Sequence, residues 1–428
     1  MRTLIPRDNW EHRMADLARG LTAGLGKGER DVRLDISGLG SGIPVGSGRA
    51  AIVAALRALN LPPGARVAVP LYCCPVVFSA IKAAGCRVRF IDVDPTTFCM
   101  SAADLSAKRA EVEAIIAVHM FGNTCDVLEL EQAGGGRPII EDCAQAIGSR
   151  RNGDPVGSFG VFGVFSFRSG KYLSVGEGGA LFSRDAGARS RAAEVVSAMP
   201  VSGAMEECVH VLRCYLKSVL RSRPFYGLVG YPLWKRWNKN GTASAVTDAS
   251  LKRIRKADYA VATRRLLNLD SAIERQREIA GFYSSALELD AGMLCAESPG
   301  AYYNRYYYPV TFPSSDHRDR IASILHRAGI DSIKYLDDVV QVARDEYGYS
   351  EDCPEAKRLS KSVLIIPGYY SLKNRDVERV AKQLNMGWRE LTRSGRDRQP
   401  AKVPTVSSGQ RPDGYLSAKS SSKSGLQV

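Results

Sequence analysis

Short apolar runs alternate with helical patterns along the first third of the chain. The runs at 67–69, 88–92, 114–118 and 138–141 are typical of strands, whereas 51–59 and 76–84 repeat apolar positions at helical spacing. Such alternation favours βαβ units and a mainly parallel sheet. We therefore predict an α/β large domain.

A different pattern follows in the second half of the chain. A long helical pattern covers about 251–289, the strand-like run 306–312 comes next, and 318–328 has helical periodicity. This order predicts a smaller C-terminal α+β domain. We place the large domain at 1–250, the small domain at 251–395 and a disordered tail at 396–428. The tail is rich in Ser, Lys, Gly and Pro, so it has too few large apolar side chains to offset the entropy of ordering.

The segment 137–182 contains an acid and a lysine in a strongly patterned setting. Asp142 ends an apolar run, so its carboxylate should lie at the carboxyl end of a strand, where open α/β sheets bind ligands. Lys171 follows a second apolar run, 161–167, on a Ser-Gly turn. Pyridoxal phosphate (PLP) requires such a pair: the lysine forms the Schiff base, and the acid keeps the pyridine nitrogen protonated. We predict Lys171 and Asp142 as catalytic residues of a PLP site.

The motifs EDCAQAIGS, GSFG, FSFRSGK and GEGGALFSRD follow one another between residues 141 and 185. In this order and spacing they resemble the DegT-like sugar aminotransferase family of fold type I PLP-dependent enzymes. Similar blocks at 47–59, 67–98, 114–130 and 363–384 extend the resemblance over about 35–391. It implies a fold type I PLP-dependent transferase, with a large domain built on a mainly parallel central sheet and a smaller C-terminal α+β domain.

The resemblance also implies cofactor-binding residues. Gln145 matches the family position beside the phenolic oxygen of the cofactor, and Ser166 matches the hydroxyl that contacts its phosphate. Gly48 and Arg49 open a helix, and first-turn helix amides form an anion site. Many relatives carry Thr where this chain has Arg49, so its guanidinium either binds the phosphate or points away.

Two positions depart from the family pattern. Cys74 stands where an aromatic residue usually stacks on the cofactor ring, so the ring is covered either by the Cys74 sulfur or by Tyr72. Leu251 stands where relatives often place an asparagine that reaches the phosphate in the neighbouring subunit, and Lys252 or Arg253 are the substitutes nearby.

The activity that the resemblance implies is transfer of an amino group, usually from L-glutamate, to a nucleotide-linked keto-sugar in amino-sugar and polysaccharide biosynthesis. It also implies a homodimer with shared active sites. Two alternatives stay open. One is a non-transaminating, dehydratase-like PLP enzyme, although known dehydratase branches replace the lysine that this chain keeps as Lys171. The other is a catalytically silent PLP-fold regulatory or partner protein, which Cys74 and Leu251 favour.

Composition indicates where the protein is located and which ligands it lacks. The ten cysteines show no CxxC pair, which disfavours a disulfide framework and favours a cytoplasmic location. The five histidines lack metal-ligand spacing, so we predict no metal site. No export signal or membrane-spanning stretch is expected. The formal charge of +14 comes without a nucleic-acid-binding motif, so we predict no specific nucleic acid and a basic surface that attracts an anionic substrate.

A segment at about 198–249 is longer than in typical relatives. Apolar residues repeat there at helical spacing, with Arg213 and Lys217 off that face: Cys208, Val211, Leu212, Tyr215, Leu216 and Val219. The segment is interpreted either as a helix packed on the enzyme or as a basic, aromatic element, 208–239, that makes weak contact with a membrane surface.

Overall fold

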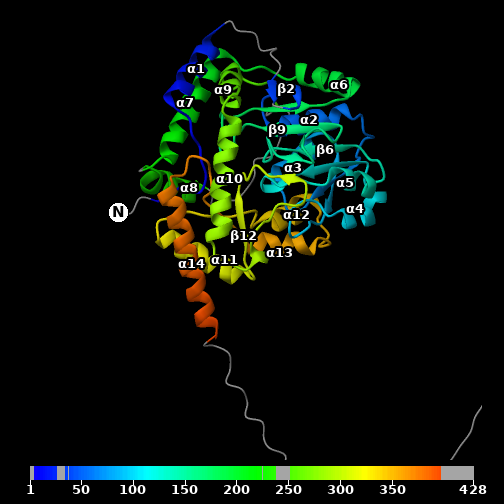
Figure 1. Cartoon of the computed structure of the whole chain (residues 1–428). Helices are drawn as coiled ribbons and strands as arrows, with labels where there is room; N and C mark the ends of the chain where they lie inside the picture. Colours follow the sequence, from blue (N-terminus) through cyan, green and yellow to red (C-terminus); the bar gives the residue numbers. More distant parts are fainter. Residues whose placement is uncertain (1–3, 27–33, 37, 224, 238–250, 397–428) are drawn as a thin grey trace, which may run out of the picture.

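The computed structural model describes residues 4–26, 34–36, 38–223, 225–237 and 251–396. An eight-stranded sheet forms the centre of the larger part of the molecule (Figure 1). Its strands, in spatial order, are β1 (Leu34–Ile36), β2 (Gly40–Val45), β10 (Gly179–Phe182), β9 (Phe162–Ser166), β6 (Ile139–Asp142), β5 (Ala114–Val118), β3 (Arg66–Pro70) and β4 (Arg87–Ile91). Strands β9, β6, β5, β3 and β4 are parallel, which confirms the predicted α/β class.

Both faces of this sheet are covered, as the continuous apolar character of its strands requires. Along β5, Ile115 and Ala117 enter the core beneath α4 (Ala102–Lys108) and α5 (Val127–Ala133). Ile116 and Val118 enter the opposite core instead. The helices on that side are α2 (Gly48–Ala58), α3 (Pro75–Ala83) and α6 (Ala186–Ser197).

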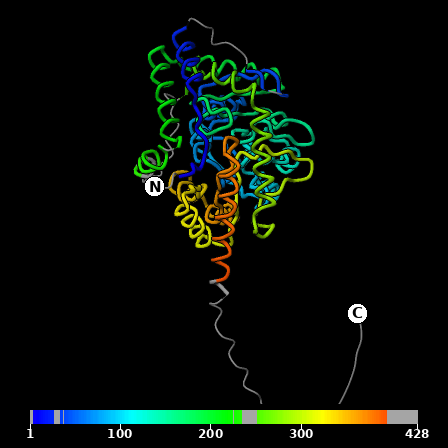
Figure 2. Tube along the Cα trace, turned by 60° about the vertical axis from the view of Figure 1, so that its left-hand side comes forward, coloured from blue at the N-terminus to red at the C-terminus, as the bar shows by residue number. Residues whose placement is uncertain are grey.

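A smaller antiparallel sheet lies in the C-terminal part, in the order β12 (Tyr308–Thr311), β14 (Val363–Ile366) and β13 (Ile333–Lys334). Its core includes residues of α10 (Leu269–Ala286), α11 (Ser315–Arg327) and α14 (Asn374–Arg396). Two further helices, α12 (Val339–Tyr347) and α13 (Pro354–Ser362), pack against the core of the large sheet. Figure 2 shows α14 projecting from the body of the molecule.

The N-terminal segment joins this smaller unit. Ile5 is fully buried in the C-terminal core and bridges Ile330, although the sequence placed it with the large domain. The pattern at 251–289 is not one helix: α9 (Lys256–Leu266) and α10 are separated at Leu267 and Asn268. The tail was predicted at 396–428, but Arg396 ends α14, and 397–428 lie outside the described residues.

The insertion forms α7 (Ala204–Arg221), the π-helix η3 (Tyr226–Gly230) and α8 (Tyr231–Trp237). In Figure 1, α1 (Met14–Leu25), α7 and α9 lie side by side. The predicted inner face of α7 is partly wrong, because Val211 and Cys214 are buried whereas Leu212 and Leu216 are 51% and 59% exposed. The helix is rotated so that His210 and Cys214 face the chain at Gly176. In the described part of the chain, no helix is long and apolar enough to cross a bilayer.

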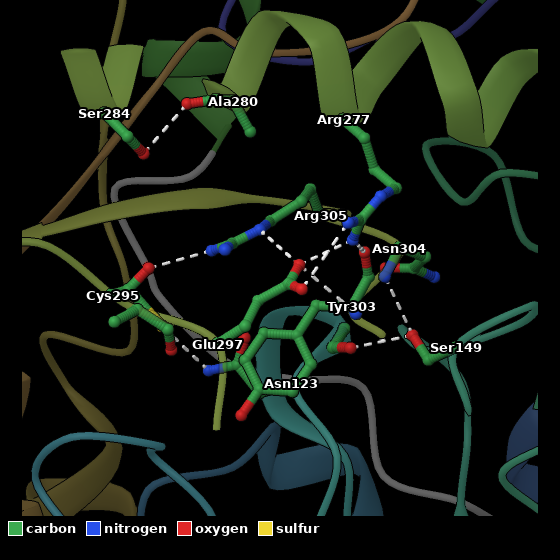
Figure 3. Close-up of polar contacts among 12 residues, drawn as sticks. Asn123, Ser149, Arg277, Ala280, Ser284, Cys295, Glu297, Tyr303, Asn304 and Arg305 are labelled. Atoms are coloured by element: carbon green, nitrogen blue, oxygen red, sulfur yellow. Dashed lines mark hydrogen bonds and ion pairs between the residues drawn. The ribbon is translucent and has the colours of Figure 1, made fainter. Parts of the chain in front are cut away.

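A polar network fixes the segment that enters β12. Glu297 accepts hydrogen bonds from Arg277 on α10 and from Arg305, whose second nitrogen donates to the Cys295 carbonyl (Figure 3). Asn304 donates through its side-chain amide to the carbonyls of Gln145 and Ile147. This network places the tyrosines after Arg305 beside the loop that follows β6.

Three short strands and three short helices complete the described fold. The strands form a small sheet, β11 (Ala301–Tyr302), β7 (Arg150–Arg151) and β8 (Asp154–Pro155). The 3-10 helices are η1 (Arg109–Glu111), η2 (Met120–Gly122) and η6 (Ala291–Met293).

Candidate active site

A pocket opens at the carboxyl ends of the parallel strands, where they face the first turn of α2. It is lined by Ser47, Gly48, Arg49, Ile52, Cys74, Val76, Val77, Val118, Asp142, Ala144, Gln145, Ser166, Arg168, Lys171, Glu177 and Tyr335. Every site residue expected from the sequence lies on this wall except Tyr72. Tyr72 is fully buried behind it and donates a hydrogen bond to the carbonyl of Tyr335 (3.3 Å).

Lys171 lies on a tight turn that follows β9. Its backbone N–H donates to the Arg168 carbonyl (2.9 Å), and Gly170 supplies the left-handed conformation, φ +93°, that the turn needs. The amine lies 4.8 Å from the centre of the Tyr306 ring and makes no hydrogen bond or ion pair within the described residues. Burial, aided by the charge of Arg168, lowers the pKa of Lys171 to about 8. About a tenth of the amine is therefore neutral and nucleophilic at pH 7, far more than for an ordinary lysine.

Asp142 is the last residue of β6 and is buried. One carboxylate oxygen accepts the N–H of Ala144 (3.0 Å), while the backbone carbonyl accepts the N–H of His119 (3.1 Å). Burial raises the pKa of Asp142, and the Ala144 N–H and the charge of Lys171 act against that shift. A cation held against this carboxylate would restore its ionised form.

The neighbouring acid, Glu141, holds the end of β6 in place. Its side chain accepts the backbone N–H groups of Gly157, Phe159 and Gly160 (2.7 Å each) and pairs with Nε2 of His119 (3.0 Å). Nδ1 of His119 accepts the N–H of Cys125, so Nε2 carries the proton given to Glu141. His119, Glu141 and Cys143 lie close enough to hold a metal ion, but these hydrogen bonds already account for Glu141 and His119.

An anion cradle lies at the start of α2. The Ser47 hydroxyl caps the helix by accepting the N–H of Ala50 (3.2 Å), which leaves the amides of Gly48 and Arg49 in the first turn. A Cβ on Gly48 would lie 2.8 Å from Cβ of Ser166, so only glycine lets the Ser166 hydroxyl approach the helix end this closely. The Ser166 hydroxyl makes no hydrogen bond within the described residues. Helix amides and a hydroxyl without a partner form a donor set suited to a phosphate group.

Arg49 faces an acid. Its guanidinium lies 3.6 Å from Glu177, which also pairs with Arg255 (2.8 Å). Arg255 in turn lies 3.6 Å from Asp258, and Asp258 hydrogen-bonds His210 of α7 (2.9 Å). Although burial opposes it, the bond to Asp258 raises the pKa of His210 to about 10. The insertion is thus linked to the pocket wall by an ionic chain.

Gln145 and Tyr335 form the opposite wall. The Gln145 carbonyl oxygen accepts the N–H of Phe121 (3.2 Å), and its amide donates to the Tyr335 hydroxyl (3.0 Å). To donate to a cofactor, Gln145 would use its second amide hydrogen, which lies against the Met120 sulfur (3.5 Å).

Sequence reasoning missed three titratable residues that line this pocket: Arg168, Glu177 and Tyr335. Arg168 and Glu177 lie in the FSFRSGK and GEGGALFSRD motifs, next to Lys171 in the sequence. Their charges could have marked them as pocket residues. Tyr335 gave no signal, because it comes from the C-terminal part of the chain and reaches the pocket only through tertiary packing. Leu251, which stands where relatives often place an asparagine, is buried in the core of the large sheet.

The fold is that of the fold type I class of PLP-dependent transferases, and an acid and a lysine lie together in its pocket. The model of the DegT/DnrJ/EryC1/StrS aminotransferase family matches residues 34–385. The chain belongs to that family.

Individual relatives extend over most of the chain. A UDP-N-acetyl-3-dehydro-alpha-D-glucosamine 3-aminotransferase of Acidithiobacillus ferrooxidans is 29% identical over 81% of this chain and 84% of its own. A pleiotropic regulatory protein of Geobacillus stearothermophilus is 27% identical over 80% of this chain and 84% of its own. The aminotransferase TlmJ of Streptoalloteichus hindustanus shares the fold, with a TM-score of 0.71 and 22% identity over 91% of this chain and all of that one.

Proposed function

We propose that this chain is a PLP-dependent aminotransferase that passes an amino group from L-glutamate to a nucleotide-linked keto-sugar in amino-sugar or polysaccharide biosynthesis. The observation that carries this proposal is the meeting of Lys171, Asp142 and the cradle at α2 in one pocket. The relative from Acidithiobacillus ferrooxidans, whose name specifies a UDP-linked keto-sugar, supports the class of acceptor. We also propose a cytoplasmic location, because the ten cysteines form no disulfide.

The residues of the pocket fit PLP. Asp142 would hold the pyridine nitrogen, the first-turn amides of α2 with Ser166 would hold the phosphate, and Lys171 would hold the aldehyde carbon. Cys74 lies on the pocket wall and Tyr72 does not, so Cys74 is the residue proposed to cover the ring. When bound, PLP supplies an electron sink.

The chain itself handles the proton. With a pKa of about 8, Lys171 Nζ would be able to take the proton from the α-carbon of the donor and to release it again. Asp142 would keep the pyridine nitrogen of a bound cofactor protonated during this transfer. Both steps occur out of bulk water, because Asp142 is buried and Lys171 is partly buried.

The absorption spectrum of the purified protein tests the proposal. We expect a bound PLP chromophore that is converted by L-glutamate, with release of one equivalent of 2-oxoglutarate per site. Absence of PLP after reconstitution would instead support a catalytically silent regulatory protein. The relative from Geobacillus stearothermophilus is named as a regulatory protein. A chromophore that no amino acid converts would favour the dehydratase-like alternative.

We also propose that the chain forms a homodimer with shared active sites.

We further propose a weak contact between 208–239 and an anionic membrane surface. The outer side of the insertion supports this contact, because apolar side chains are exposed there beside Arg213 and Lys217: Leu212, Leu216, Phe225, Leu228 and Val229. Apolar side chains beside cations are typical of elements that lie at anionic lipid surfaces. The side chains of Trp234 and Trp237 lie outside the described part.

Changing Arg213 and Lys217 together to Gln should weaken binding to phosphatidylserine vesicles about thirtyfold, since each basic residue contributes about 1 kcal/mol at such a surface. Arg221 and Arg223 are left unchanged, because they pair with Asp8 and Asp376 inside the fold. Sedimentation with vesicles at low salt measures the effect, and a Lys82→Gln/Lys382→Gln variant is the control. If the parent does not sediment, the membrane contact is refuted. If Leu212→Ser/Leu216→Ser instead yields monomers, a second copy of the chain covers this face.

A further inference from the structure

Arg168 is a cation without an acidic partner in the pocket. It lies between Ser166 and Lys171, is exposed and lines the pocket wall. Its side chain makes no hydrogen bond or ion pair with any described residue. Arg49, the other arginine of the pocket, faces Glu177. A guanidinium that lines a pocket and has no acidic partner is well suited to bind an anion by charge-assisted hydrogen bonds.

Arg168 also has neighbours in the pocket that do not belong to the phosphate cradle. Its electrostatic neighbours are Cys74, Tyr306, Tyr307 and Tyr335. Tyr335 accepts its hydrogen bond from Gln145 and has no acceptor for its own proton within the described residues. The Tyr335 O–H and the Arg168 guanidinium are therefore two donors on the same side of the pocket.

The position of Arg168 also limits the kind of anion. Lys171 closes a turn onto the Arg168 carbonyl, and the Arg168 charge acts on the Lys171 amine. An anion on Arg168 would therefore lie near the α-carbon of the donor, from which Lys171 would take the proton. The α-carboxylate of an amino acid is one bond from that carbon, whereas the diphosphate of a nucleotide sugar is separated from the reacting ketone by atoms of the sugar ring.

We propose that Arg168 and Tyr335 bind the α-carboxylate of the amino donor and so select an α-amino acid over a simple amine. This inference rests on the proposed function, because it assigns the donor subsite of that reaction. Arg168 would act on the donor alone, while the α2 cradle serves the phosphate.

The test measures binding without turnover. 2-Methyl-L-glutamate keeps the α-carboxylate but lacks the α-proton, so its dissociation constant can be read from the absorbance of the PLP-loaded protein. Arg168→Gln should raise this constant about 10- to 100-fold, the loss expected for a charge-assisted hydrogen bond, and Tyr335→Phe should raise it about 3- to 10-fold. The dissociation constant for PLP should change by less than about threefold, and Arg168→Lys should restore part of the affinity. Arg109→Gln, on an exposed arginine of η1, is the matched control.

A second comparison isolates the carboxylate. 4-Aminobutanoate is glutamate without its α-carboxylate, so Arg168→Gln should hardly change how it binds. Equal weakening for both ligands, or loss of PLP in place of the donor, would overturn the assignment. If 2-methyl-L-glutamate binds through Arg168 but L-glutamate releases no 2-oxoglutarate, the subsite stands and the proposed function fails. No absorbance response in the parent protein overturns the subsite.

Discussion

Replacing Lys171 by Ala should lower the rate of amino transfer by at least about a thousandfold. General acid–base catalysis alone contributes about 10²–10⁴-fold, and the variant also loses the nucleophile that holds the cofactor covalently. No other lysine lines the pocket within the described residues. Release of 2-oxoglutarate from L-glutamate, measured in a single turnover, gives the rate.

The fold should not suffer from this change, because the Lys171 amine has no hydrogen-bond or ion-pair partner in the described structure. Borohydride reduction followed by mass spectrometry gives a second readout: the peptide that contains Lys171 should carry the cofactor in the parent and not in the variant. Lys82→Ala, on an exposed lysine at the end of α3, is the control. Amino transfer near the parental rate in Lys171→Ala would refute the assignment.

The pKa of Lys171 gives this prediction a pH dependence. Below pH 8 the amine is mostly protonated and cannot attack an aldehyde. The rate at which added PLP becomes covalently attached to the apoprotein should therefore rise about tenfold per pH unit up to pH 8 and level off above it. A profile that levels off only near pH 10.5 would mean that burial does not shift this amine.

The sequence predicted the parts of the site that depend on local pattern. Asp142 could be placed because an apolar run of strand length ends there, and the alternation of such runs with helical patterns predicted the parallel sheet. The anion cradle at Gly48 could be predicted because its donors are backbone groups at the start of a helix. Motifs in a fixed order supported each of these positions.

Other features depend on long-range packing and left no local signal. Tyr335 reaches the pocket from the C-terminal part of the chain. Two contacts determine which face of α7 is buried: His210 binds Asp258, and Val211 packs against the small Gly20 of α1. Hydrophobic periodicity contains neither contact, so it predicted part of the buried face wrongly. The break between α9 and α10 has no Gly or Pro to mark it.

Replacing Asp142 by Asn should leave the fold and most PLP binding intact while lowering the rate of amino transfer about 100- to 5,000-fold. The amide oxygen of Asn can still accept the Ala144 N–H, and Glu141 and His119 hold the end of β6 independently of the changed charge. A neutral amide, however, cannot stabilise a proton on the pyridine nitrogen. The loss of one partner of a buried charge pair costs about 3–5 kcal/mol, which corresponds to that range of rates.

The absorbance of bound PLP measures occupancy in Asp142→Asn, and single-turnover release of 2-oxoglutarate measures the rate. Asp154→Asn, on an exposed acid of β8, controls for the loss of one negative charge. A rate that falls while occupancy persists assigns Asp142 to the chemistry of the ring. Loss of occupancy alone, with the bound fraction reacting as in the parent, would mean that another group protonates the ring nitrogen and that Asp142 only helps to hold the cofactor.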